Sequence, residues 1–99
     1  MPPELENLLL QHPRIVDAAV IGVPTDDGDE LPRAYVVKRP GTELTEAEVY
    51  DWVAGKLARY KRLDGGVVFL EAVPKNASGK IQKKTLREWA AEEKVKAKL

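Results

Sequence analysis

Apolar residues at helical spacing predict three helices. After two prolines that suit a first turn, Leu5, Leu8 and Leu9 define the first helix, and His12-Pro13 ends it because the residue before a proline disfavours the α region. A capping box at Thr45–Glu48 starts the second helix, whose inward face carries Val49, Trp52, Val53, Leu57 and Tyr60. The third helix spans residues 83 to 95, and three of its side chains are expected to face inward: Leu86, Trp89 and Ala90.

Three short runs rich in β-branched residues predict strands at residues 16–23, 33–38 and 67–70. The acidic segment 25–30 is interpreted as a solvated turn, since its carboxylates lack the spacing of a calcium loop, and Glu30-Leu31-Pro32 is interpreted as an architectural turn. The element order is helix, strand, strand, helix, strand, helix. It predicts an α+β fold in which a small three-stranded sheet is flanked by helices, with residues 1–99 as a single domain.

Composition is that of a globular domain without thiol chemistry. The chain has 99 residues, 43% hydrophobic and 32% charged, and no cysteine, which excludes disulfides and thiolate metal sites. Its net charge is zero, yet residues 1–50 carry four basic against ten acidic side chains, and residues 51–99 carry twelve against six. An anionic ligand near the basic half is one interpretation, and mixing of the halves on one surface is the other. Neither a nucleic-acid partner nor a membrane span is expected.

The polar loop Pro74–Lys80 carries the candidate chemistry. It lies between an expected strand and an expected helix, so a lysine at its end can be delivered into the active site of another domain. An ammonium is a compact point charge that suits a carboxylate or phosphate on which charge develops during reaction. Composition alone leaves a second interpretation open, in which Lys80 is a solvated lysine in a turn.

Other catalytic schemes lack the residues they need. His12, beside Pro13 at a helix end, is interpreted as a surface residue, and no serine–histidine–carboxylate set forms around it. Zinc would need ligands that the chain does not have. A Walker phosphate loop would need glycine at position 74 and serine or threonine at position 81, where Pro74 and Ile81 stand.

Six segments, in order and over nearly the whole chain, resemble the C-terminal domain of the adenylate-forming enzymes. That family includes acyl-CoA synthetases, 4-coumarate–CoA ligases, firefly luciferase and peptide-synthetase adenylation domains. The matching segments are Pro3-Glu4-Leu5-Glu6, His12-Pro13, residues 17–24, residues 30–37, Tyr60-Lys61 and residues 74–81. Residues 60–66 and the lysine loop most resemble the 4-coumarate–CoA ligase-like branch.

The resemblance implies an ATP-dependent carboxylic acid–CoA ligase. In that family a large N-terminal domain binds ATP, Mg²⁺ and the acid, and the small C-terminal domain closes over it. Lys80 would contact the carboxylate and the α-phosphate of ATP or AMP, while Ser78 and Gly79 would only shape the loop. Pyrophosphate leaves, acyl-AMP remains, and the domain swings so that the thiol of CoA displaces AMP. Lys61 receives no role.

The resemblance also implies that an ATP-binding domain and a hinge precede these residues in the parent protein. Met1 is therefore interpreted as a start introduced into a longer chain, and the fragment alone is expected to fold without catalysing. Two alternatives stay open. One is a stand-alone interaction or regulatory domain, and the other is an adenylation domain that passes its acyl group to a carrier protein or to an oxygenation step.

The last three residues, Ala97-Lys98-Leu99, resemble the Ser-Lys-Leu peroxisomal address. This similarity predicts a peroxisomal location and an import receptor as a partner. The alternative is a frayed helix end in a cytoplasmic protein.

Overall fold

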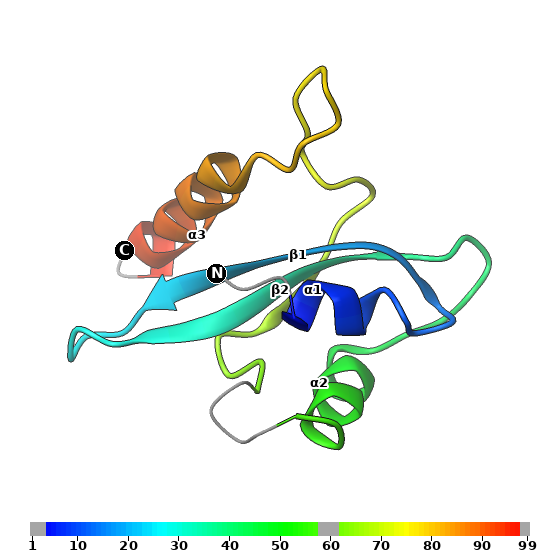
Figure 1. Cartoon of the computed structure of the whole chain (residues 1–99). Coiled ribbons are helices and arrows are strands. Elements are labelled where there is room, and N and C mark those ends of the chain that lie inside the picture. The colour runs from blue at the N-terminus through cyan, green and yellow to red at the C-terminus, as the bar shows by residue number, and fades with distance from the viewer. Residues whose placement is uncertain (1–3, 58–61, 98–99) are drawn as a thin grey trace.

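In the described part of the chain, three strands form one sheet and three helices cover its two faces (Figure 1). The computed structural model describes residues 4–57 and 62–97. In chain order the elements are α1 (Glu4–Leu9), β1 (Ile15–Pro24), β2 (Glu30–Lys38), α2 (Glu46–Ala54), β3 (Val67–Phe69) and α3 (Lys83–Ala97). β2 is central, antiparallel to β1 and parallel to β3. The predicted α+β class and element order are confirmed.

Both faces of the sheet are buried, which explains why β1 is almost continuously apolar. Ala18 and Val20 face one cluster, which α1 and α2 cover, while Ala19 and Ile21 face the other, which α3 covers through the fully buried Leu86. Side chains on a strand alternate between the two faces, so each strand contributes to two separate cores. The second cluster, through Leu86 and Ala90, fixes α3 against the sheet, and with it the segment that precedes α3.

The start of α2 is set locally, as the sequence predicts. Thr45 accepts a hydrogen bond from the backbone N–H of Glu48 at 3.1 Å, and the Glu48 carboxylate accepts from the backbone N–H of Thr45 at 3.0 Å. Hydrogen bonding of the Glu48 carboxylate to Thr45, first to its backbone N–H, lowers the pKa of Glu48. Val49 and Val53 are fully buried and Trp52 is partly buried. Tyr60, expected on the same face, lies outside the described residues.

Three expectations need correction. Glu30-Leu31-Pro32 is not a turn: it belongs to β2, with Pro32 opposite Gly22 of β1, so the strand starts three residues early. Trp89 is 40% exposed rather than inward, because it lies on the flank of α3 and touches the edge of the Tyr35 ring.

His12 is the third correction, since it is partly buried rather than a surface residue. Its ring meets Trp52 edge-on, with centroids 5.0 Å apart, and its Nδ1 accepts a hydrogen bond from the backbone N–H of Arg14 at 3.0 Å. The imidazole therefore has a structural role: it binds the turn after α1 and packs against Trp52 of α2.

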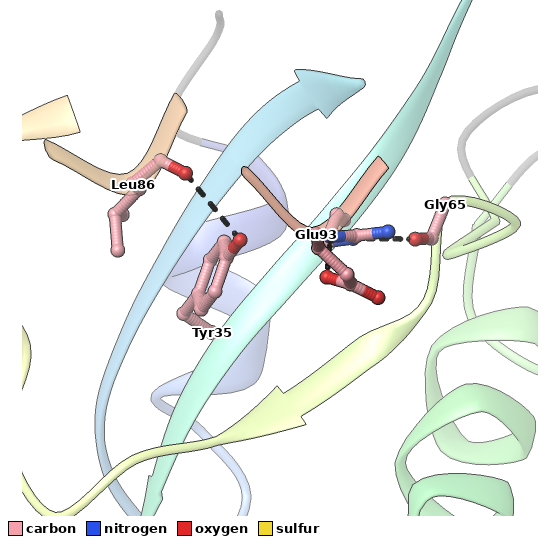
Figure 2. Close-up of polar contacts among 5 residues, drawn as sticks. Tyr35, Gly65, Leu86 and Glu93 are labelled. Carbon is pink, nitrogen blue, oxygen red and sulfur yellow. Dashed lines mark hydrogen bonds and ion pairs between the residues drawn. The ribbon is translucent and has the colours of Figure 1, made fainter. Parts of the chain in front are cut away.

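Polar bonds also tie α3 to the sheet, as Figure 2 shows. Arg33 of β2 donates from Nε to the carbonyl of Gly65 at 2.7 Å and pairs through Nη1 with Glu93 of α3 at 2.9 Å. The Tyr35 hydroxyl lies 3.5 Å from the Leu86 carbonyl. In the described part of the chain, no helix has both the length and the apolar character that crossing a membrane requires.

Candidate functional site

The predicted lysine loop lies between β3 and α3 and projects beyond both the sheet and α3 (Figure 1). Pro74 is partly buried, whereas residues 75–80 are all exposed. In residues 4–57 and 62–97, no hydrogen bond or ion pair holds the ammonium of Lys80. The side chain is therefore presented to solvent on a protruding loop, where a second surface can reach it.

The base of the loop is closed by backbone pairing. Lys75 and Ile81 form an isolated antiparallel bridge, and the backbone N–H of Gln82 donates to the carbonyl of Pro74 at 2.9 Å. Below the bridge, Val73 and Ile81 pack into the core cluster under α3. The loop thus leaves the domain from a fixed and partly apolar base.

One side chain, that of Asn76, orders the tip of the loop, residues 76–80. The amide Oδ1 of Asn76 accepts from the backbone N–H of Ser78 at 3.0 Å, from the Ser78 hydroxyl at 2.7 Å and from the backbone N–H of Lys80 at 3.0 Å. The backbone of Asn76 donates to the Lys80 carbonyl at 2.9 Å and accepts from the N–H of Gly79 at 3.0 Å. Gly79 has φ +86°, a left-handed conformation that glycine adopts without steric cost.

Two ion pairs brace the flanks of the loop. Before the tip, Lys75 Nζ lies 2.6 Å from the carboxylate of Asp17 on β1. After it, Lys83 Nζ lies 3.3 Å from the carboxylate of Glu6 on α1, which also accepts from the backbone N–H of Val20 at 2.9 Å. The Glu6 side chain is only 14% exposed. The ion pair between Glu6 and Lys83 is therefore less screened by water than the ion pair at Lys75. The Glu6 carboxylate also satisfies a backbone N–H of β1, which is an edge strand of the sheet.

The described residues contain no group of three or more histidine, cysteine or acidic side chains that could hold a metal ion. A groove of about 690 Å³ lies elsewhere, between the end of the β1–β2 hairpin and the second half of α3. Val23, Arg33, Ala90 and Lys94 are among its lining residues, and none of residues 74–80 is. The groove is thus separate from the lysine loop.

Sequence reasoning found Lys80, Ser78 and Gly79 but missed Asn76, Asp17 and Glu6. An asparagine two residues before a serine is a known signal for a local turn in which its side chain accepts a backbone N–H, so Asn76 could have been found. Asp17 and Glu6 pair with residues far away in the sequence, and no local pattern marks them. Tyr60-Lys61 lies outside the described residues.

Comparison with known proteins identifies the family of this chain. The family described as AMP-binding enzyme C-terminal domain matches residues 4–80. The chain belongs to that family. Its relatives include an acyl-CoA ligase of Purpureocillium lilacinum, 50% identical over 90% of this chain, and a probable 4-coumarate–CoA ligase of Dictyostelium discoideum, 46% identical over 89%. The chain spans 24% and 16% of the lengths of these two relatives.

Solved structures agree with the fold. ATP-bound MatB from Rhodopseudomonas palustris is 39% identical, with a TM-score of 0.81 over 88% of this chain and 17% of its own. The anthranilate–CoA ligase AuaEII in complex with anthranoyl-AMP is 37% identical, with a TM-score of 0.79 over 90% of this chain and 18% of its own. The resemblance seen in the sequence is thereby confirmed at the level of family and fold.

Proposed function

We propose that this chain is the mobile C-terminal domain of an ATP-dependent carboxylic acid–CoA ligase, and that Lys80 is its adenylation lysine. The observation that carries the proposal is the exposed ammonium of Lys80, which no side chain of residues 4–57 and 62–97 pairs, on a protruding and braced loop in a chain of this family. The N-terminal adenylation domain of the same protein is the partner that the loop would enter.

Lys80 would act by electrostatics in the first half-reaction. A carboxylate oxygen of the acid attacks the α-phosphorus of ATP, the bond to the β-phosphate oxygen breaks, and pyrophosphate leaves acyl-AMP behind. Both reactants are anionic, so an ammonium between them offsets their repulsion and stabilises the charge that builds in the transition state. In the second half-reaction the thiol of CoA attacks the acyl carbon, loses its proton and displaces AMP.

The remaining residues of the loop have structural roles. Ser78 and Gly79 shape the tip and take no part in bond making, in keeping with their hydrogen bonds to Asn76. We assign no Mg²⁺ ligand to the described residues, which hold no acidic cluster suited to one. The metal that accompanies ATP would be bound by the N-terminal domain.

The test is ATP–pyrophosphate exchange by a chimera in which this chain replaces the C-terminal domain of AuaEII, with anthranilate as the acid. Lys80→Ala should lower the exchange rate by roughly 100-fold or more, because it removes the positive charge that stabilises the transition state. Lys84→Ala, another exposed lysine, serves as the matched control and should leave the rate unchanged.

Two results would contradict the proposal. One is an unchanged exchange rate in a folded Lys80→Ala chimera. The other is a wild-type chimera that exchanges no faster than AuaEII without its C-terminal domain, since this chain would then not complete the active site. Circular dichroism of each variant separates loss of function from loss of fold.

We further propose that Ala97-Lys98-Leu99 directs import into peroxisomes when it stands at a free C-terminus. A fluorescent protein that ends in residues 88–99 should collect in peroxisomes, whereas the same fusion with Lys98→Glu should stay in the cytosol. Diffuse signal from the unmodified fusion would contradict the assignment.

A further inference from the structure

Asn76 makes five hydrogen bonds within a loop that has no core of its own. Three reach its side-chain oxygen, from the N–H and the hydroxyl of Ser78 and from the N–H of Lys80. Two involve its backbone, which binds the Lys80 carbonyl and the Gly79 N–H. Asn76 therefore contacts both peptide groups that flank the Cα of Lys80.

This arrangement fixes the position from which the lysine side chain starts. The ammonium of a lysine sits on a flexible four-carbon stem, so its reach is defined by its Cα. With the N–H and the C=O of Lys80 both bonded to Asn76, the Cα can move only with the whole tip. Without the Asn76 amide only the two backbone bonds would remain, and the exposed residues 76–80 would regain part of the backbone freedom that folding removes.

The rest of the domain does not depend on this amide. The base of the loop is held by the Lys75–Ile81 bridge, by the bond from Gln82 to Pro74 and by the ion pair between Lys75 and Asp17. Asn76 itself is exposed. Its side chain therefore orders the tip without supporting the fold.

We infer that Asn76 is the positioning residue for Lys80. Its amide oxygen fixes the conformation of the loop tip, so that the ammonium is correctly placed between the reacting phosphate and carboxylate. This inference rests on the proposed function. Catalytic geometry is sensitive at this scale, because a misplacement of about 1 Å can cost on the order of 100-fold in rate.

The kinetic test uses the AuaEII chimera with Asn76→Ala and Asn76→Asp. Alanine removes the acceptor, and kcat for anthranilate-dependent exchange should fall by about 10- to 100-fold while KM for ATP changes little, since ATP is bound by the other domain. Aspartate keeps an acceptor oxygen in the same place and should restore most of the activity. Ser78→Ala, which deletes only one of the three donors to that oxygen, is the matched control and should cost far less.

A second measurement on the 99-residue chain is independent of catalysis. Amide hydrogen exchange by NMR should show protection of the Ser78 and Lys80 N–H groups that is lost in Asn76→Ala and kept in Asn76→Asp. Protection of the Gln82 N–H at the base should not change. Protection at Ser78 and Lys80 that survives in Asn76→Ala would overturn the inference.

The outcomes also separate this inference from the proposed function. If Lys80→Ala is inactive while Asn76→Ala exchanges at the wild-type rate, Lys80 keeps its role and Asn76 loses the one inferred here. If Asn76→Ala raises KM for ATP and leaves kcat unchanged, the positioning role of Asn76 is likewise contradicted. If Lys80→Ala is fully active, the proposed function fails, and the hydrogen-exchange result alone then decides whether Asn76 orders the tip.

Discussion

Replacing Gly65 with alanine is expected to destabilise the domain far more than its place in an ordinary turn suggests. A Cβ at this position would stand 2.7 Å from the carbonyl oxygens of both Leu31 and Pro32, and 2.8 Å from a methyl group of Val23. Two of these three atoms belong to the backbone of the central strand, so no rotamer change can relieve the contact. Gly65 is required here for space, since its φ lies outside the left-handed region.

The magnitude follows from what must move. Overpacking a well-packed site costs about 1–3 kcal/mol, and rigid backbone neighbours place this case at the upper end of that range. Shifting the turn also strains two hydrogen bonds, from the Gly65 N–H to the Pro32 carbonyl at 2.8 Å and from Arg33 Nε to the Gly65 carbonyl at 2.7 Å. Each such bond contributes about 1 kcal/mol. Gly65→Ala should therefore cost about 3–5 kcal/mol, much of the total stability of a small domain.

Urea unfolding followed by circular dichroism measures this cost, and other glycines of the same chain supply matched controls. Gly55 has φ −74° and its nearest backbone contact for a Cβ is 3.5 Å, so Gly55→Ala should be neutral or stabilising by up to about 1 kcal/mol. Gly79 has φ +86° and open space, so Gly79→Ala should cost only the left-handed strain of about 1–2 kcal/mol. A Gly65→Ala variant within about 1 kcal/mol of wild type would refute the steric argument.

Two further predictions concern the core and pH. Leu86→Ala should cost about 2–5 kcal/mol because Leu86 is fully buried, whereas Trp89→Ala should cost less because Trp89 is 40% exposed; chemical denaturation that ranks them in the reverse order would contradict the packing of α3. Burial, and then the charge of Arg14, lower the pKa of His12 below its ordinary 6.5. The unfolded chain therefore protonates first, so stability should fall as the pH drops below 6.5, and His12→Gln should flatten that dependence; an equal slope in both proteins would exclude His12 as its source.

Local signals account for the part of the fold that could be predicted from the sequence. The capping box at Thr45 and Glu48 forms as predicted because both partners lie within one helical turn. The strands were found because β-branched runs bounded by prolines need no distant information. Trp89 was predicted wrongly because helical spacing shows which side of a helix is buried but not how far around the helix the buried surface extends. Leu86 and Ala90, one turn apart, pack against the sheet, and the Trp89 ring extends over the edge of this contact.

In the candidate site, too, the local features could be predicted from the sequence and the long-range contacts could not. Lys80 stands out in the sequence because it ends a polar loop that resembles the lysine loop of a known family, and the turn made by Asn76 is local enough to be predicted. The braces are not, because Lys83 pairs with Glu6 across 77 residues and Lys75 pairs with Asp17 of β1. Such pairs exist only after β1, α1 and the loop have come together in the fold. A charge on a free loop would spend little time at any one place, so the proposed use of Lys80 depends as much on these distant carboxylates as on the loop motif itself.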